Sequence, residues 1–491
     1  MRLAELIKVV PGAVLEVGET ENPEVSSIEC DSRRVTDGSV FVAIRGGQER
    51  DRHQFVADAV ARGAAAVVVE ENDVPSGGAA RIRVRNCRLA LAELGAWVNG
   101  YPAAHLCTVG VTGTNGKTTT ALLVRRILEA ARISCGYVGT LGAQVGDDME
   151  DLANTTPEAS ELHDLLRRMV DGGRDAVVLE VSSHALALER VAGIEFNAVI
   201  FTNLTRDHLD FHGSEAAYWE AKARVFERLH CCGTARAVVN LDDPVSSLLL
   251  ERAAGRSITF GRHMEADVRL LEAIDTDSGT DIRLHTGSGD FEVSTRLTGE
   301  FNCSNVMAAV ACAFGLGIGR KAVCLGLASL DNVPGRLEAV DEGQGFHVLV
   351  DYAHTPAGLE TVLLAARKVT RERLICLFGC GGDRDVGKRP LMGRIASKLA
   401  DVVMLTSDNP RSESPKNIIA DITAGMKCRD ALSHVDRREA IFRVIELARA
   451  GDTVVIAGKG DESHQVFADR AVRFDDREVA REALHGRLSR A

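Results

Sequence analysis

A short glycine-containing loop between a predicted strand and a predicted helix constrains the fold of this 491-residue chain most strongly. Residues 105–111 form an apolar run typical of a buried strand, and residues 118–131 have helical periodicity. Between them the chain reads Thr-Gly-Thr-Asn-Gly-Lys-Thr-Thr over residues 112–119. This order is the context of a P-loop, in which backbone N–H groups at a helix N-terminus surround a phosphate. We therefore predict a nucleoside triphosphate site.

The predicted phosphate site consists of Gly113, Thr114, Asn115, Gly116, Lys117, Thr118 and Thr119. Lys117 would reach the β- and γ-phosphates, and the Thr118 hydroxyl would contact Mg²⁺. The strict P-loop pattern is not met, because Val111 occupies the position of its first glycine. The alternative is a glycine-rich turn that precedes an ordinary helix.

The strand–helix alternation continues through the chain and predicts an α/β fold. Residues 175–181 and 198–203 repeat the strand signal, and so do residues 346–350, 374–378, 402–406 and 453–457. Such alternation is typical of parallel sheets with helices on both faces. A turn at residues 332–335 marks a boundary, and we predict domains over residues 1–100, 101–333 and 334–491.

Composition and charge exclude several classes of protein. The net charge of −12 and the 4% aromatic content argue against a nucleic-acid partner. The longest apolar run, residues 306–314, is too short to span a bilayer, and Glu5 and Lys8 interrupt any signal-peptide pattern. The 12 cysteines include no C-x-x-C pair, which indicates reduced thiols. We expect a soluble, cytoplasmic monomer without membrane insertion.

Polar residues follow the predicted strands of the middle region. Glu180 ends the 175–181 strand, and His208 follows the 198–203 strand. Ligands of open parallel sheets bind at the carboxyl ends of strands, and a carboxylate in an apolar strand is costly unless it is paired or binds metal. These two residues are candidate Mg²⁺ ligands. A salt-bridged strand end and an ordinary loop histidine are the alternatives.

Ten sequence blocks in the same order resemble the Mur ligases, the ATP-dependent amino-acid ligases of peptidoglycan synthesis. The resemblance extends over essentially the whole chain. The blocks are residues 113–119, 154–157, 180–184, 207–210, 218–222, 302–305, 351–356, 379–384, 408–411 and 458–460.

The resemblance implies a three-domain Mur ligase architecture, with an N-terminal domain for the UDP end of the substrate, a central P-loop ATPase domain and a C-terminal Rossmann-like domain. It also implies a reaction. ATP would phosphorylate a free carboxylate of UDP-MurNAc-L-Ala-D-Glu, and the amine of an incoming amino acid would displace phosphate from the acyl phosphate. Mg²⁺ and Lys117 would neutralise charge during phosphoryl transfer.

The resemblance assigns roles to individual residues. Lys117, Glu180, His208 and Lys222 would be catalytic, and Thr118, Glu180, His208 and Lys222 would bind the metals. Lys222 matches the lysine that the family carbamylates, although its position in a helix would otherwise predict a solvated lysine. The further ATP contacts would be Asn302, Asn305, Arg336, Asp351 and His354.

The resemblance also places the UDP-MurNAc-dipeptide. Its contacts would be Cys30, Ser32, Gln48, Asn154, Thr155, Thr156, Ser182 and Arg190. Two positions depart from the family pattern, because Leu188 replaces a glutamine and Gly47 replaces a histidine.

The amino acid that is added depends on one arginine. Arg411 can hold the second carboxylate of meso-diaminopimelate, which L-lysine lacks, with a planar fork of donors. The family's lysine-adding members lack this arginine in the motif, so the resemblance favours diaminopimelate. The full predicted set is Arg384, Asp408, Asn409, Pro410, Arg411, Gly458 and Glu462. Asp461 stands where the family commonly has histidine.

Three other functions compete with this one. A lysine-adding ligase of the same family would differ at the contact to Arg411. A folylpolyglutamate synthase would share the P-loop but not the blocks at residues 154–157 and 408–411. A P-loop switch or kinase would leave the C-terminal motifs unexplained.

Overall fold

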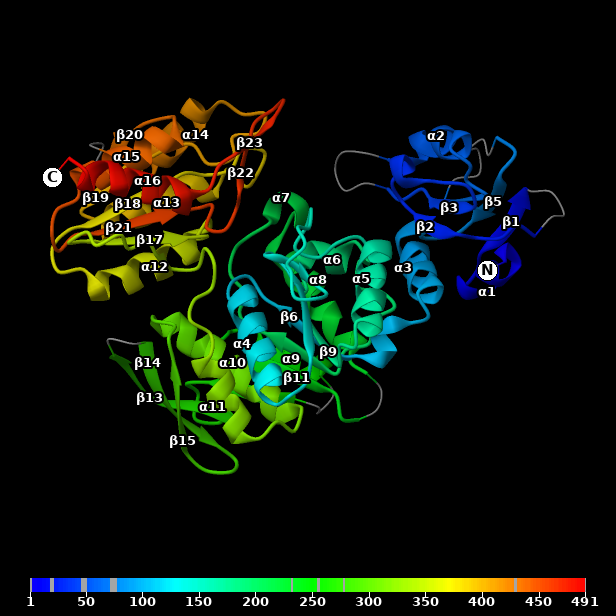
Figure 1. The fold of residues 1–491 in the computed structure, drawn as a ribbon, viewed down its shortest axis with the longest axis horizontal. Coiled ribbons are helices and arrows are strands. Elements are labelled where there is room, and N and C mark those ends of the chain that lie inside the picture. Colours follow the sequence, from blue (N-terminus) through cyan, green and yellow to red (C-terminus); the bar gives the residue numbers. More distant parts are fainter. Residues whose placement is uncertain are drawn as a thin grey trace.

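The computed structural model describes residues 2–17, 22–45, 51–70, 77–230, 233–253, 257–276, 279–427 and 431–490. These residues form three lobes that follow one another along the chain, each around its own β-sheet (Figure 1). The N-terminal and C-terminal lobes lie on different sides of the central one (Figure 1). The predicted α/β class and three-domain architecture are confirmed. The boundaries at residues 100 and 333 remain predictions.

The N-terminal lobe is a five-stranded sheet in the order β1-β5-β4-β3-β2. Its strands are parallel except for β1, which pairs antiparallel with β5. Apolar residues of β3, β4 and α3 form its core. Its elements are α1 (Leu3–Val9), β1 (Val14–Val17), β2 (Ser27–Glu29), η1 (Ser32–Arg34), β3 (Ser39–Val42), η2 (Arg52–Phe55), α2 (Val56–Ala61), β4 (Ala66–Val69), β5 (Ala80–Arg83) and α3 (Cys87–Val98).

The central lobe is a ten-stranded sheet in the order β15-β14-β13-β12-β11-β10-β6-β9-β7-β8. Its first half contains η3 (Pro102–His105), β6 (Cys107–Thr112), α4 (Lys117–Ala130), β7 (Cys135–Gly139), β8 (Gly142–Gln144), α5 (Ala159–Asp171), β9 (Ala176–Glu180), α6 (Ser183–Ala187) and β10 (Ala198–Phe201). Its second half contains α7 (Leu209–His212), α8 (Glu215–Ala223), η4 (Arg224–Arg228), β11 (Arg236–Asn240), α9 (Ser246–Arg252), β12 (Ser257–Gly261), β13 (Val268–Thr276), β14 (Gly279–Thr286), β15 (Phe291–Thr295), α10 (Glu300–Gly315) and α11 (Arg320–Ala328).

The predicted parallel sheet is correct for the middle of the central lobe and wrong at its edges. Strands β7, β9, β6, β10, β11 and β12 pair in parallel, whereas β13, β14 and β15 form an antiparallel meander and β8 pairs antiparallel with β7. Buried and exposed residues alternate along much of β14 and β15, as expected for strands with one solvated face.

The C-terminal lobe is a six-stranded sheet in the order β16-β17-β21-β18-β19-β20. Helices α12, α13 and α14 contribute to the apolar core on one face, and α15 and α16 to the core on the other, as predicted. The elements are β16 (Glu338–Ala339), β17 (His347–Asp351), α12 (Pro356–Val369), β18 (Leu374–Phe378), α13 (Lys388–Leu399), β19 (Val402–Leu405), α14 (Pro415–Ala424), β20 (Leu432–Ser433), α15 (Arg437–Leu447), β21 (Thr453–Ala457), β22 (His464–Val466), β23 (Ala471–Arg473) and α16 (Asp476–Leu488).

Two general predictions can be compared with the described residues. No helix among them is both long and apolar enough to cross a membrane. The nine cysteines within the described ranges are free thiols.

Candidate functional site

A cavity of about 670 Å³ lies between the central and C-terminal lobes, where the carboxyl ends of strands from both sheets meet. Most of the predicted site residues line it. They are Thr114, Asn115, Gly116, Lys117, Thr118, Thr119, Asn154, Thr155, Glu180, Ser182, Arg190, His208, Asn305, Arg336, Asp351, His354, Arg384, Asp408, Asn409, Arg411, Gly458 and Glu462. Residues predicted from separate motifs therefore line one cavity.

The phosphate loop connects β6 to α4, as predicted. Gly113 and Gly116 have φ angles of +146° and +84°, and a Cβ at these positions would lie 1.9 Å from the Thr202 hydroxyl and 2.3 Å from the Asn305 side-chain oxygen. Both glycines are therefore required by close contacts. Val111 is fully buried in β6, one residue before the strand ends, so the missing first glycine lies outside the turn itself.

Two lysines, of which Lys222 is buried, donate to one backbone carbonyl of this loop. Lys117 Nζ lies 3.1 Å from the Gly113 oxygen, and Lys222 Nζ lies 2.7 Å from the same oxygen. Burial lowers the pKa of Lys117, and it lowers the pKa of Lys222 well below its usual range, with the charge of Lys117 adding to the effect. The alternative of a solvated lysine at this position is excluded, because Lys222 is only 2% exposed. Its amine lies behind the loop rather than on the cavity wall.

Glu180 ends β9 and is fully buried. Its carboxylate accepts hydrogen bonds from the Thr118 hydroxyl at 3.1 Å, from the Thr140 N–H and hydroxyl at 3.1 and 3.2 Å, and from the Tyr137 hydroxyl. These donors stabilise the buried charge and fix its direction toward the first turn of α4.

His208 lies in the left-handed region, with φ +52°, and its imidazole is 3.2 Å from the Asp207 carboxylate. Burial lowers the pKa of His208 to about 2, so the ring is neutral. His354 of the C-terminal lobe lies 3.7 Å from the same carboxylate. Asp207, which was not among the predicted site residues, therefore connects the two walls of the cavity. Its position beside His208 in the Asp-His-Leu-Asp block was the available signal.

The predicted metal ligands were compared with this geometry. Among the residues that the structure describes, no group of three or more His, Cys, Asp and Glu side chains is arranged to hold a metal ion. The Thr118 hydroxyl and the Glu180 carboxylate nevertheless lie 3.1 Å apart at the loop, and hydroxyl and carboxylate oxygens are donors that suit Mg²⁺. The neutral ring of His208 lines the same cavity. The oxygen pair fits a magnesium ion.

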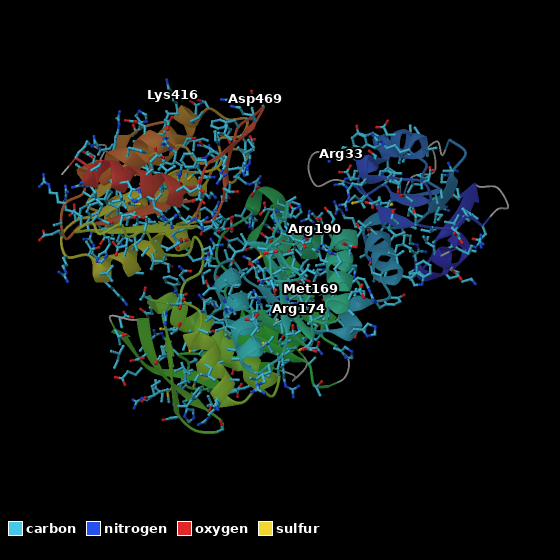
Figure 2. The ribbon with its side chains drawn as sticks, viewed as in Figure 1. Arg33, Met169, Arg174, Arg190, Lys416 and Asp469 are labelled. Atoms are coloured by element: carbon cyan, nitrogen blue, oxygen red, sulfur yellow. The ribbon has the colours of Figure 1, made fainter. Side chains whose placement is uncertain are left out.

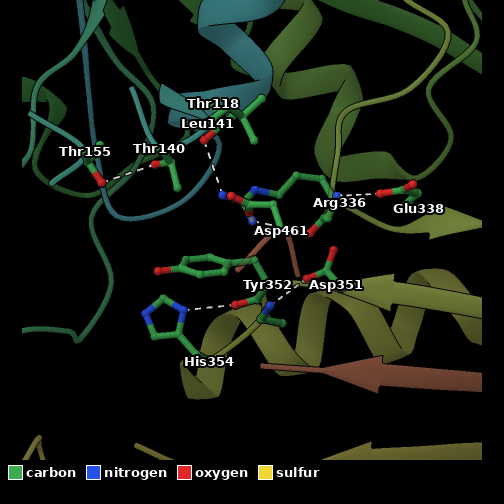
Figure 3. Close-up of polar contacts among 12 residues, drawn as sticks. Thr118, Thr140, Leu141, Thr155, Arg336, Glu338, Asp351, Tyr352, His354 and Asp461 are labelled. Atoms are coloured by element: carbon green, nitrogen blue, oxygen red, sulfur yellow. Dashed lines mark hydrogen bonds and ion pairs between the residues drawn. The ribbon is translucent and has the colours of Figure 1, made fainter. Parts of the chain in front are cut away.

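The other predicted ATP contacts come from α10 and from the segment that enters the C-terminal lobe. The side-chain amide of Asn305 donates to the Asn302 oxygen at 3.0 Å, and Asn302 itself is set back from the cavity. Asp351 accepts the backbone N–H groups of Leu337 and Ala353 at 2.6 and 2.7 Å, and burial raises its pKa. Figure 3 shows Arg336, Asp351 and His354 around this junction.

The C-terminal wall carries two arginines side by side. Arg411 has φ +50° and donates to the Gly382 carbonyl at 2.8 Å, and Arg384 donates to the Asp383 carbonyl at 3.0 Å. Burial and the charge of Arg384 lower the pKa of Arg411. With the described residues, neither guanidinium forms an ion pair. The pair is therefore suited to receive a carboxylate.

Carboxylates and amides complete this wall. Glu462 accepts the side-chain amide of Asn409 and the amine of Lys459, both at 2.8 Å. Asp408 has one buried carboxylate oxygen without a hydrogen-bond partner among the described residues. A Cβ on Gly458 would lie 2.6 Å from that oxygen, so the glycine keeps the space open. Pro410 follows Asn409 but does not line the cavity.

The predicted UDP-sugar contacts are divided between two places. Asn154, Thr155, Ser182 and Arg190 line the cavity, and Thr156 donates from behind them to the Glu180 carbonyl at 2.8 Å. Cys30 and Ser32 lie in the N-terminal lobe and do not line it. Burial raises the pKa of Cys30 to about 11, so its thiol stays protonated. Gln48 and Gly47 lie outside the described residues.

An ion-pair network that the sequence did not predict joins the N-terminal and central lobes. Arg88 and Arg190 lie 3.3 and 2.8 Å from the two carboxylate oxygens of Glu158, and Arg190 also donates to the Thr156 carbonyl at 3.0 Å. Figure 2 shows Arg190 on the central lobe and Arg33 on the N-terminal lobe. The backbone carbonyl of Leu188 also accepts from Arg88 at 3.5 Å, a contact that does not depend on the side chain at this position.

Comparison with known proteins agrees with the geometry. The Mur ligase middle domain matches residues 111–313, and the Mur ligase, glutamate ligase domain matches residues 335–460. Two UDP-N-acetylmuramoyl-L-alanyl-D-glutamate–2,6-diaminopimelate ligases are 45% and 42% identical to this chain, from Syntrophomonas wolfei subsp. wolfei and Geobacillus kaustophilus respectively. Each alignment covers 99% of this chain and 100% of the relative.

A solved structure of a ligase with the same name has a TM-score of 0.66 and 33% identity, and the match covers 98% of this chain and 99% of that one. Sequence, fold and cavity thus agree over the full length. The chain belongs to the Mur ligase family, in the group of UDP-N-acetylmuramoyl-L-alanyl-D-glutamate–2,6-diaminopimelate ligases.

Proposed function

We propose that this protein is an ATP-dependent ligase that joins meso-2,6-diaminopimelate to the γ-carboxylate of D-Glu in UDP-MurNAc-L-Ala-D-Glu. The observation that carries the proposal is one cavity with a phosphate loop on one wall and, on the other, Arg384 and Arg411, which have no ion-pair partner among the described residues. A ligase needs this combination, because an activated carboxylate and an incoming amine must meet without water.

The central wall would activate the carboxylate. The N–H groups of residues 113–119 and the amine of Lys117 would hold the phosphates of ATP, and Asn305 and Arg336 would add contacts. In-line transfer of the γ-phosphoryl group to the D-Glu carboxylate releases ADP and gives an acyl phosphate. Donors fixed before the reaction stabilise the charge that develops on the transferred group.

Thr118, Glu180 and His208 would hold Mg²⁺, which supplies charge neutralisation at the phosphates when bound. Lys222 is suited to carbamylation, because a lysine becomes a nucleophile toward carbon dioxide only as a neutral amine. Burial behind the loop lowers its pKa and favours that form. The resulting carbamate would place an anionic oxygen group where the amine had been.

The C-terminal wall would receive diaminopimelate. Arg411 would bind its distal carboxylate with two parallel N–H donors, and Arg384 lies beside it. Asp408, Asn409, Gly458 and Glu462 would orient the ionic groups of the amino acid. Its amine then attacks the acyl phosphate carbon, the C–O bond to phosphate breaks, and inorganic phosphate leaves with its electron pair.

The UDP-sugar peptide would extend from this cavity to the N-terminal lobe. Asn154, Thr155, Thr156, Ser182 and Arg190 would hold the peptide end. Cys30, Ser32 and Gln48 would contact the UDP-MurNAc end, and of these Cys30 and Ser32 lie in the N-terminal lobe and do not line the cavity. The Glu158 network between the lobes lies along this path. We place the reaction in the cytoplasm, where ATP is supplied, with a monomer as the working unit.

Phosphate release tests this function. The protein is mixed with ATP, Mg²⁺ and UDP-MurNAc-L-Ala-D-Glu, and meso-diaminopimelate is compared with L-lysine. We expect release that depends on diaminopimelate and is weak with lysine. Release with lysine instead would retain the ligase but overturn the role of Arg411. Release without any amino acid would favour a different ATPase, and folate-dependent release would favour a folylpolyglutamate synthase.

A further inference from the structure

Asp461, a departure from the family pattern, lies in contact with the nucleotide side of the cavity. Its carboxylate forms an ion pair with Arg336 at 3.1 Å, and the two side chains are only 9% and 18% exposed. Arg336 in turn donates to the Thr118 hydroxyl of the phosphate loop at 3.3 Å. Asp461 follows β21 in the C-terminal lobe, whereas Thr118 belongs to α4 of the central lobe. A single guanidinium therefore connects the two lobes (Figure 3).

The guanidinium of Arg336 is held from several directions. Its carbon lies 4.3 Å from the centre of the Tyr352 ring, which supports one face of the plane. One terminal nitrogen donates to Asp461 and to the Gly335 carbonyl at 3.3 Å, and the other points to Thr118. Asp461 is the acidic partner in this arrangement, since the nearby Asp351 is occupied by backbone N–H groups.

Backbone packing fixes Asp461 relative to Arg336. A Cβ on Gly335 would lie 2.1 Å from the Asp461 nitrogen, and a Cβ on Gly460 would lie 2.7 Å from the Gly335 oxygen. The segment that enters the C-terminal lobe and the turn after β21 are thus in direct contact. Tyr352 donates its N–H to the Gly335 carbonyl at 2.9 Å and completes the contact.

We propose that Asp461 is a positioning residue that holds Arg336 against the phosphate loop and so increases affinity for the nucleotide. The inference rests on the proposed function, because it requires Arg336 to contact the phosphates. Asp461 itself does not line the cavity. Without the Asp461 carboxylate, Arg336 would lose one of the contacts that hold its guanidinium in place. Nucleotide binding would then have to order this side chain, which lowers the affinity.

The test is calorimetric titration of the full chain with ADP and Mg²⁺, together with separate KM values for ATP and diaminopimelate. Asp461→Asn should weaken ADP binding and raise the KM for ATP by about 10- to 100-fold, the range expected for loss of a charge-assisted hydrogen bond. The KM for diaminopimelate should change little. Asp461→Glu, which keeps the charge, should restore most of the affinity.

Glu338→Gln is the matched control. This carboxylate accepts the Gly335 N–H at 2.8 Å and pairs with Arg477 at 3.3 Å, so it belongs to the same segment but does not touch Arg336. The Glu338→Gln protein should bind ADP with a dissociation constant within about twofold of that of the unmodified protein. In an Arg336→Gln background, Asp461→Asn should have almost no further effect, because the residue through which it acts is gone.

Several results would overturn the inference. They are unchanged ADP affinity in Asp461→Asn, an equal loss in Glu338→Gln, or a full additional loss in the Arg336→Gln background. If the Asp461→Asn protein does not fold, Asp461→Ser is used in its place, alone and in the Arg336→Gln background. The unmodified protein shows separately whether the proposed function holds. If that function is wrong, the unmodified protein will release no phosphate in response to diaminopimelate, independently of how the variants bind ADP.

Discussion

The cations at the phosphate loop and those on the C-terminal wall of the cavity differ in chemical form and in burial, because Lys222 is buried whereas Arg384 is exposed. At the phosphate loop, Lys117 and Lys222 share the Gly113 carbonyl, and burial lowers the pKa of both amines. The C-terminal wall has Arg384 and Arg411, which donate to backbone carbonyls and have no carboxylate partner among the described residues. An amine can lose its proton under such conditions, whereas a guanidinium keeps its charge.

This difference separates two tasks. A lysine that is easily neutralised can change its chemistry, which suits Lys222 for carbamylation. An arginine with a permanent charge remains a receptor for a carboxylate, which suits Arg411 for diaminopimelate. The comparison therefore predicts that activity falls when lysine replaces Arg411 and when arginine replaces Lys222, although the formal charge is kept in both cases.

The largest effect is expected on the C-terminal wall. Arg411→Ala, or Arg411→Lys, should lower kcat/KM for diaminopimelate by about 10²–10⁴-fold, because two charge-assisted hydrogen bonds to the distal carboxylate are lost or distorted. ADP affinity should be unchanged, as measured by calorimetry. Arg443→Ala, an exposed arginine of the same lobe, is the control. Unchanged kinetics for diaminopimelate in both Arg411 variants would contradict the assignment.

Behind the phosphate loop, Lys222→Arg should reduce kcat by about 10²–10³-fold, the range for removal of one preorganised charged group at the reacting centre. A guanidinium cannot be neutralised and cannot become a carbamate. The measurement is diaminopimelate-dependent phosphate release, with Lys368→Arg as the control on an exposed lysine. Retention of most activity by Lys222→Arg would show that the neutral amine is not needed.

The protonation of Lys222 itself can be followed through stability. In buffer free of carbon dioxide, the unfolded chain binds a proton at this amine up to a pKa of about 10.4, whereas the folded protein releases it at lower pH. The free energy of unfolding should therefore rise with pH through this window, by up to about 1.4 kcal/mol per pH unit from this group. Lys222→Met should make the dependence shallower.

Denaturant titrations between pH 6 and 9 measure this slope, and Trp219 lies on the same helix as Lys222 and provides a fluorescent signal. Lys368→Met should leave the slope as it is. Identical slopes for Lys222→Met and the unmodified protein would mean that Lys222 keeps its proton in the fold.

The smallest effect is expected from a cation at the rim of the cavity. Arg206 of the central lobe lies 3.3 Å from Asp385 of the C-terminal lobe, with side chains 42% and 12% exposed. Exposed pairs contribute about 0.2–1 kcal/mol. Arg206→Ala should change kcat/KM by no more than about fivefold, and the difference should shrink in high salt. A loss of 100-fold would show that this pair belongs to the reacting site.

Features encoded by consecutive residues could be predicted from the sequence. The strands at residues 374–378 and 453–457 have the predicted bounds, and the phosphate loop lies between a strand and a helix as predicted. These elements follow from local hydrophobic runs and glycines. The antiparallel meander of β13, β14 and β15 was missed, because apolar runs alone do not fix the direction in which strands pair.

Features that depend on distant contacts could not be predicted from the residues alone. The burial of Lys222 results from its contact with Gly113, 109 positions earlier, and the partner of Arg336 lies 125 positions later. The resemblance to the family nevertheless identified Lys222 and Arg336, because their roles were carried over from matching family positions. They gave no partner for Asp461, where the chain departs from the family, and only the structure places it beside Arg336.

The central claim is that the substrate carboxylate activated at the central wall reacts, as an acyl phosphate, with the amine held at the C-terminal wall. Transfer of an oxygen isotope tests this claim most directly. UDP-MurNAc-L-Ala-D-Glu labelled with ¹⁸O in the D-Glu γ-carboxylate is converted with ATP and diaminopimelate, and the released phosphate is analysed by mass spectrometry. The proposed reaction predicts one ¹⁸O atom in each phosphate, because the carboxylate oxygen leaves with the phosphoryl group. Unlabelled phosphate with full amide formation would contradict it.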